Sequence, residues 1–162
     1  MIGQEYGGYY LTQSAVAPRA EPLLVDLPDT SFPDNTTWVP VLPTTVFTLP
    51  AARSGNTLVQ IALNLHLTWT AANGLQAICD WSIDGGAHFQ RSFHMLVDKQ
   101  DDSTMNGLDA VFWQVVSGLN PSVSIVGRQP VGVLGLAIVG ANNVTWPALA
   151  SRAVIFDMGP TA

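Results

Sequence analysis

The chain has 162 residues, of which 48% are apolar and only 11% are charged, with a formal net charge of −6. This apolar content excludes an intrinsically disordered chain, the single cysteine excludes an internal disulfide framework, and only six basic residues argue against nucleic-acid binding. Soluble domains carry about 25% charged residues. The low charge therefore favours an assembly in which part of the surface is buried between subunits.

Residues 1–36 differ from the rest of the chain. They hold four prolines, all three tyrosines (Tyr6, Tyr9 and Tyr10) and no sustained period of 2 or 3.6. Such a segment cannot enclose a core, so we expect an extended arm over residues 1–36 and one domain over residues 37–162. A frayed terminus is the alternative. We expect the tyrosines to contact a partner, because they combine a large contact area with a polar tip.

From Trp38 onward, apolar and polar residues alternate. The clearest strand covers residues 58–70, in which every second residue is apolar: Val59, Ile61, Leu63, Leu65, Leu67 and Trp69. The same pattern predicts strands over residues 38–42, 45–49, 76–84, 87–97, 108–117, 122–128, 131–139 and 152–158. A tight turn at Asp84-Gly85-Gly86 joins two of them. Strands at this spacing without a helical window predict an all-β fold, an antiparallel β-sandwich or barrel.

Arg91 interrupts this pattern. It falls on the inward side of its strand between Phe89 and Phe93, where an unpaired charge would be costly. Three explanations remain open: a bulge redirects the side chain, a carboxylate such as Asp80 or Asp109 pairs with it, or this side of the strand lines a subunit contact.

Two tryptophans are candidate contacts. Trp113 alternates with Val111 and Val115, while Phe112 takes the opposite side of the strand. A strand that is apolar on both sides meets another layer or another subunit. Trp146 falls in a predicted loop, where it contacts a subunit, stacks on a sugar or anchors the loop.

No catalytic or cofactor motif is present in the sequence, so we expect no enzyme, no cofactor and no metal. His88 and His94 are separated by about 20 Å along a strand and cannot share an ion. Cys79 alternates with core residues and is predicted to be a buried small hydrophobe rather than a nucleophile. The acidic loop at residues 98–102 offers oxygen ligands for calcium, but a solvated loop is the commoner outcome.

The chain shows no signal peptide and no membrane span. Its longest apolar stretch, residues 131–141, is shorter than the roughly 20 residues that a spanning helix needs. The first twenty residues lack a basic start followed by an apolar run. We therefore expect synthesis in a cytoplasm, without a signal peptide, and no membrane partner.

Three stretches carry a resemblance to a known class of proteins: residues 81–86 (WSIDGG) followed by Phe89 and Phe93, residues 115–122 (VVSGLNPS) and residues 152–157 (RAVIFD). This succession resembles the jelly-roll modules, of tumour-necrosis-factor-like shape, in head-decoration, head-fibre and tail receptor-binding proteins of tailed bacteriophages. The resemblance implies a non-enzymatic protein of the virion, commonly a homotrimer, that contacts other virion proteins such as the major capsid or tail protein. The competing class is a carbohydrate-binding module or lectin that binds a host glycan.

Overall fold

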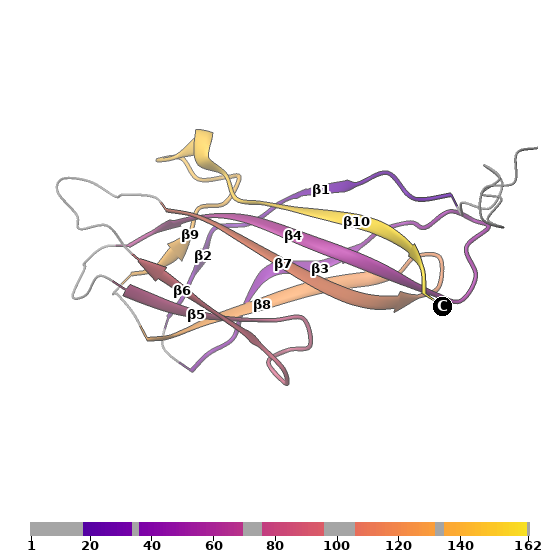
Figure 1. Cartoon of the computed structure of the whole chain (residues 1–162). Coiled ribbons are helices and arrows are strands. Elements are labelled where there is room, and N and C mark those ends of the chain that lie inside the picture. The colour runs from indigo at the N-terminus through magenta and orange to yellow at the C-terminus, as the bar shows by residue number, and fades with distance from the viewer. Residues whose placement is uncertain (1–17, 34–35, 70–75, 96–105, 132–134, 162) are drawn as a thin grey trace, which may run out of the picture.

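The computed structural model describes residues 18–33, 36–69, 76–95, 106–131 and 135–161. They form two antiparallel sheets whose strands run along the length of an elongated molecule (Figure 1). The predicted all-β sandwich is confirmed. Among these residues, no helix is long and apolar enough to cross a membrane.

Each sheet contains four main strands. Sheet A has the order β1 (Leu23–Asp26), β10 (Arg152–Pro160), β4 (Asn56–Thr68) and β7 (Asn106–Ser117), with the short strands β2 (Thr30–Ser31) and β9 (Ala137–Ile138) added to it. Sheet B has the order β3 (Val39–Val46), β8 (Ser122–Val131), β5 (Gln76–Ser82) and β6 (Gln90–Met95). The chain passes to the opposite sheet after most main strands, which is the topology of a jelly roll.

Strand β4 forms the centre of the core. Its inward side chains are all buried, as the alternation predicts: Val59, Ile61, Leu63, Leu65 and Leu67. The side chains between them are half-buried or exposed, because they point away from sheet B. Trp69, Cys79 and Trp81 are also buried, which confirms their predicted core positions.

Residues 23–33 belong to the sandwich in the structure, although their composition placed them in the predicted arm. Strand β1 pairs with β10, so that Leu23 lies opposite Ile155, and β2 pairs with β9. Leu27 and Phe32 are buried in the core. These contacts join residues far apart in the chain, and no local period marks them.

Most predicted strand boundaries differ from the structure by a few residues, and three of the differences are larger. The predicted strands 38–42 and 45–49 are replaced by one strand, β3, which ends at Val46 and holds two register shifts around its prolines. Of the predicted strand 131–139, Val131 ends β8 and Ala137–Ile138 form the short β9. The returning strand of the hairpin begins at Gln90 instead of Ala87, so the connecting loop covers residues 83–89.

The turn glycines of this hairpin have the predicted positive φ. Gly85 has φ +71° and Gly86 has φ +101°. The Ser82 hydroxyl accepts hydrogen bonds from the amides of Asp84 and Gly86, and it donates one to the Asp84 carboxylate. The loop is therefore ordered by its own side chains.

Candidate interaction surfaces

A carboxylate shared by two arginines lies on the outer side of sheet B. Arg91 Nε and Nη2 donate to the two oxygens of Asp80 at 2.7 and 3.1 Å. Arg128 Nε and Nη2 lie 3.1 and 3.0 Å from Asp80 Oδ2. Asp80 is fully buried beneath these guanidinium groups, whereas 44% of the Arg91 side chain is exposed.

The predicted inward position of Arg91 is wrong. Arg91 lies directly opposite Asp80 in the register of β5 and β6, so the two side chains share the outer side of sheet B. Phe89, also predicted to point inward, is 46% exposed. The physical reason is the hairpin loop, which is longer than a tight turn and shifts the register of the returning strand. Of the three explanations for Arg91, pairing with Asp80 is the one that the structure shows.

Aromatic rings enclose the second arginine. The Arg128 guanidinium lies 4.6 Å from the centre of the Trp38 ring and 5.3 Å from that of Phe89. These rings are 6.1 Å apart, and Arg91 lies 5.5 Å from the Phe89 ring. Trp38 also packs on Gly86, where a β-carbon would collide with its indole. We call Trp38, Asp80, Phe89, Arg91 and Arg128 the arginine–aromatic cluster; it fixes the hairpin loop against sheet B.

A small cavity of about 170 Å³ lies beside this cluster, between the hairpin loop and β7. Its lining is largely aromatic, with a few polar side chains: Trp81, Ser82, Ile83, His88, Phe89, Gln90, Phe112 and Trp113. The exposed His88 ring lies 2.6 Å from the Asp84 carboxylate. Trp113 and Arg91, both predicted as contact residues, therefore lie near the same phenylalanine, Phe89.

The arginine–aromatic cluster makes stability depend on pH. Burial raises the pKa of Asp80, but the hydrogen bonds and charges of Arg91 and Arg128 outweigh it and hold the pKa below the ordinary value of 3.8. A carboxyl whose pKa is lower in the folded state stabilises the fold above its unfolded pKa. This contribution disappears as the pH falls through the folded pKa.

We therefore expect Asp80→Asn to lower the free energy of unfolding at neutral pH by about 1–3 kcal/mol. The difference from the wild type should shrink as the pH falls below about 4. Urea unfolding at neutral pH and at several acidic pH values measures both quantities. A difference that is the same at every pH would contradict the assigned role of the carboxylate.

The outer face of sheet A is a second candidate surface. We define it by the apolar or uncharged side chains that point away from sheet B: Leu24, Leu58, Gln60, Ala62, Val111, Trp113, Val115, Val154, Phe156 and Met158. The strand register places them in rows, one of which runs Leu24, Val154, Ala62, Val111 across four strands. Side chains at its two edges are the most exposed, with Leu24 at 58%, Trp113 at 50% and Val115 at 54%.

Charge is confined to one end of this face. Asp26 and Arg152, which lie next to each other in the register, form an ion pair of 3.0 Å, and both are 56% exposed. The register also places Asp109, opposite Asn64, and the half-buried His66 at this end. The rest of the face is apolar apart from amide and hydroxyl groups.

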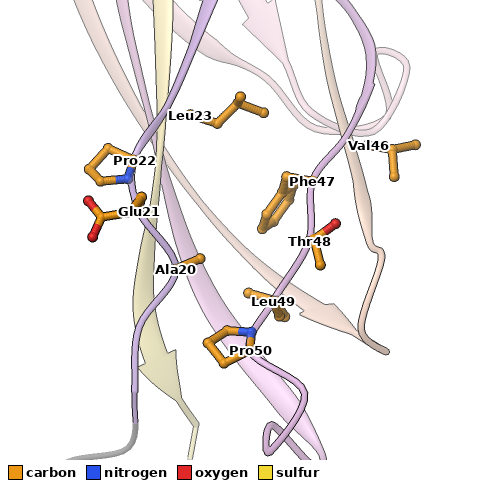
Figure 2. Close-up of a pocket in the computed structure, with 9 residues that line it drawn as sticks. All are labelled: Ala20, Glu21, Pro22, Leu23, Val46, Phe47, Thr48, Leu49 and Pro50. Carbon is orange, nitrogen blue, oxygen red and sulfur yellow. The ribbon is translucent and has the colours of Figure 1, made fainter.

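An apolar groove of about 600 Å³ opens between the edges of the two sheets. Its walls are residues 20–23, which lead into β1, and residues 46–50 at the end of β3 (Figure 2). Figure 2 shows Leu23, Phe47 and Leu49 directed into the space between these two segments. The sequence pattern did not predict this groove, because residues 20–23, which form one of its walls, lie within the predicted arm.

The remaining predicted site residues do not join these surfaces. Tyr6, Tyr9, Tyr10 and the acidic loop at 98–102 lie outside the described residues. Trp146 is half-buried in a loop, where its amide donates to Asn143 Oδ1 just before the 3-10 helix Pro147–Leu149. Burial, and then the Asp80 charge, raise the pKa of the Cys79 thiol to about 12, so it is not a ready nucleophile. Within the described ranges, no group of three or more histidine, cysteine or acidic side chains could hold a metal ion.

No family model and no curated protein sequence matches the chain. Among solved structures, it is similar to a structure of infectious bursal disease virus, Gt strain, with 11% identity and a TM-score of 0.31, covering 99% of this chain and 42% of that one. A structure of the Gx strain of the same virus matches at 10% identity and a TM-score of 0.32, covering 97% of this chain and 42% of that one. The chain thus spans less than half the length of either of these viral chains.

Proposed function

We propose that this chain is a non-enzymatic structural protein of a virion, of the kind that decorates the head or forms part of the tail of a tailed bacteriophage. The observation that carries the proposal is the apolar outer face of sheet A. An apolar patch that extends over four strands is a liability in a free monomer and is typical of a surface that meets a protein partner. In a virion that partner is another structural subunit.

The fold supports this proposal by analogy. Jelly rolls occur in viral capsid domains and in lectins, and one fold can serve several functions. The low charge of the chain favours the first of these roles, because buried subunit faces are depleted in charged residues. The assembly that we propose is a homo-oligomer, with three copies as the expected number, which also contacts the major capsid or tail protein.

The N-terminal segment would provide a further attachment. The described chain starts at Pro18, whose carbonyl accepts a 2.7 Å hydrogen bond from Arg53 Nη2, and the Ala20 amide donates to Asp157. These bonds anchor the start of the described chain to the sandwich. Tyr6 and Tyr10 precede Pro18 by 12 and 8 residues. An extended chain could carry them up to about 40 and 27 Å from it, enough to reach a neighbouring subunit.

Deletion of residues 1–17 is expected to leave the melting temperature nearly unchanged and to abolish incorporation into particles. The deletion stops there because β1 and β2 are part of sheet A. The measurement is electron microscopy of purified particles that were assembled with a labelled wild-type or truncated chain. A full-length triple variant, with alanine at Tyr6, Tyr9 and Tyr10, is the matched test of the side chains.

Two outcomes would contradict this scheme. Normal incorporation of the truncated chain would show that attachment runs through the sandwich alone. Absence of the wild-type chain from the particles would overturn the virion role itself.

Carbohydrate binding is the second candidate function, and the arginine–aromatic cluster favours it. The exposed Phe89 ring offers a stacking surface beside Arg91 and the adjoining cavity, and aromatic rings flanked by hydrogen-bond donors are typical of ligand sites. A glycan array probed with the wild type and with Phe89→Ala tests this role. Binding that disappears in the variant would favour a lectin, and no binding by the wild type would reject it.

A further inference from the structure

We infer that the outer face of sheet A is the contact between copies of this chain, in which the face of one copy packs on a second copy. This inference rests on the proposed function, since it names the partner that the apolar face meets. It also assigns residues to the contact: Trp113 and Val115 at one edge and Leu24 at the other, with Phe156 and Gln60 between them.

The area of the face suits a protein interface. Its strands contain 4, 9, 13 and 12 residues in the order β1, β10, β4 and β7. Each strand residue covers about 16 Å² of a sheet, so the face measures about 600 Å². A contact between two copies would therefore bury about 1,200 Å² in total, the lower limit for specific and stable interfaces.

The distribution of charge favours a second copy over a charged partner. The charged positions, Asp26, Arg152 and Asp109, share one row at one end of the face, and the apolar rows hold no charged residue. The apolar rows of two copies can pack on each other without repulsion between like charges. A strongly charged partner would meet no side chains of opposite charge on these rows. The one amide among these rows, Gln60, offers both a donor and an acceptor to a polar group of the neighbouring copy.

The geometry of the face suits sheet packing. Two sheets pack face to face about 10 Å apart when apolar side chains on alternate residues interdigitate. The residues of β7 that alternate in this way, Val111, Trp113 and Val115, are all more than 40% exposed. In the described part of the chain, no third layer of strands covers them (Figure 1).

The test is the mass in solution of the full-length chain and four glutamate variants, measured by light scattering at several micromolar concentrations. Trp113→Glu and Leu24→Glu place a charge at opposite edges of the face. Val144→Glu and Leu119→Glu are matched controls, because these residues are 93% and 41% exposed and lie in loops outside the face. Far-UV circular dichroism and a thermal melt establish that each variant is folded.

We expect the wild type and both controls to have two or three times the 17.3 kDa chain mass. Both face variants should associate at least about thirtyfold more weakly, because each places an unpaired carboxylate in an apolar contact. Because the two face variants lie on different strands, misfolding of one leaves the other to decide the result.

Two results would overturn the inference. One is a monomeric wild type; if deletion of residues 1–17 then produced oligomers, the face would be covered by the chain's own N-terminal segment. The other is an oligomer that all four variants retain. A monomeric wild type that still enters particles would refute this contact but not the virion role. An oligomer that depends on the face but is absent from particles would refute the virion role but not this contact.

Discussion

Replacing Arg53 with alanine is expected to lower the free energy of unfolding by about 3–5 kcal/mol. Arg53 forms an ion pair of 2.7 Å with Asp157, and their side chains are only 3% and 0% exposed. Its guanidinium also donates to the Thr57 hydroxyl and to the Pro18 carbonyl. Without Arg53, the Asp157 carboxylate would remain buried without its ion-pair partner, and the start of the described chain would lose one of its anchors.

An exposed ion pair of the same chain is the matched control. Arg152 and Asp26 are both 56% exposed, and water screens the attraction between them. We expect Arg152→Ala to cost less than about 1 kcal/mol. Urea unfolding of both variants at neutral pH gives the comparison, and equal losses would contradict the assigned importance of burial.

Replacing Trp81 with alanine is expected to cost about 3–5 kcal/mol, because it opens a large cavity between the two sheets. Trp81 is buried, its ring lies edge-on to Phe32 at 6.2 Å, and its Nε1 donates to Ser92 Oγ. Its six-membered ring also packs on Gly127, where a β-carbon would lie 2.9 Å from it. The cavity is therefore lined from β5, β6, β8 and the segment after β2, and no single neighbour can fill it.

His66→Ala is the control for this prediction. His66 follows the buried Leu65 on β4 but points away from the core and is half-buried. Its backbone bonds to Ser151 and Val139 do not involve the imidazole. We expect a loss below about 1 kcal/mol, and a loss as large as that of Trp81→Ala would contradict the register of β4. Thermal and urea unfolding measure both variants.

The parts of the fold that local pattern determines were predictable. Strand β4 alternates over its whole length, so its buried series follows from the sequence, and the two glycines of the hairpin indicate its positive-φ turn. Strands β1 and β2 were not predictable, since each is short and depends on a partner more than 100 residues away. The Arg53–Asp157 ion pair was not predictable for the same reason, because its two residues are 104 positions apart in the chain.

The candidate surfaces were predictable only where the alternation of apolar residues along a single strand indicates them. Trp113 was identified because Val111, Trp113 and Val115 alternate on β7. The arginine–aromatic cluster combines residues from β5, β6 and β8 with Trp38, just ahead of β3, and Phe89 of the hairpin loop. Its assembly depends on the register of the hairpin, which is set by a loop whose length was not predicted. A single error in that loop moved Arg91 and Phe89 to the wrong side of the sheet.

The position of β1 beside β10 has a consequence for how the protein reaches its native state. Sheet A closes only when Leu23 meets Ile155, so nearly the whole chain must be synthesised before this sheet is complete. Contacts between residues so far apart in the chain form slowly, on the order of milliseconds to seconds in all-β domains. The chain must lose the entropy of closing a long loop before the contact contributes any stability. Until β10 arrives, β4 presents an unpaired edge, and a nascent chain in this state is prone to associate with its neighbours.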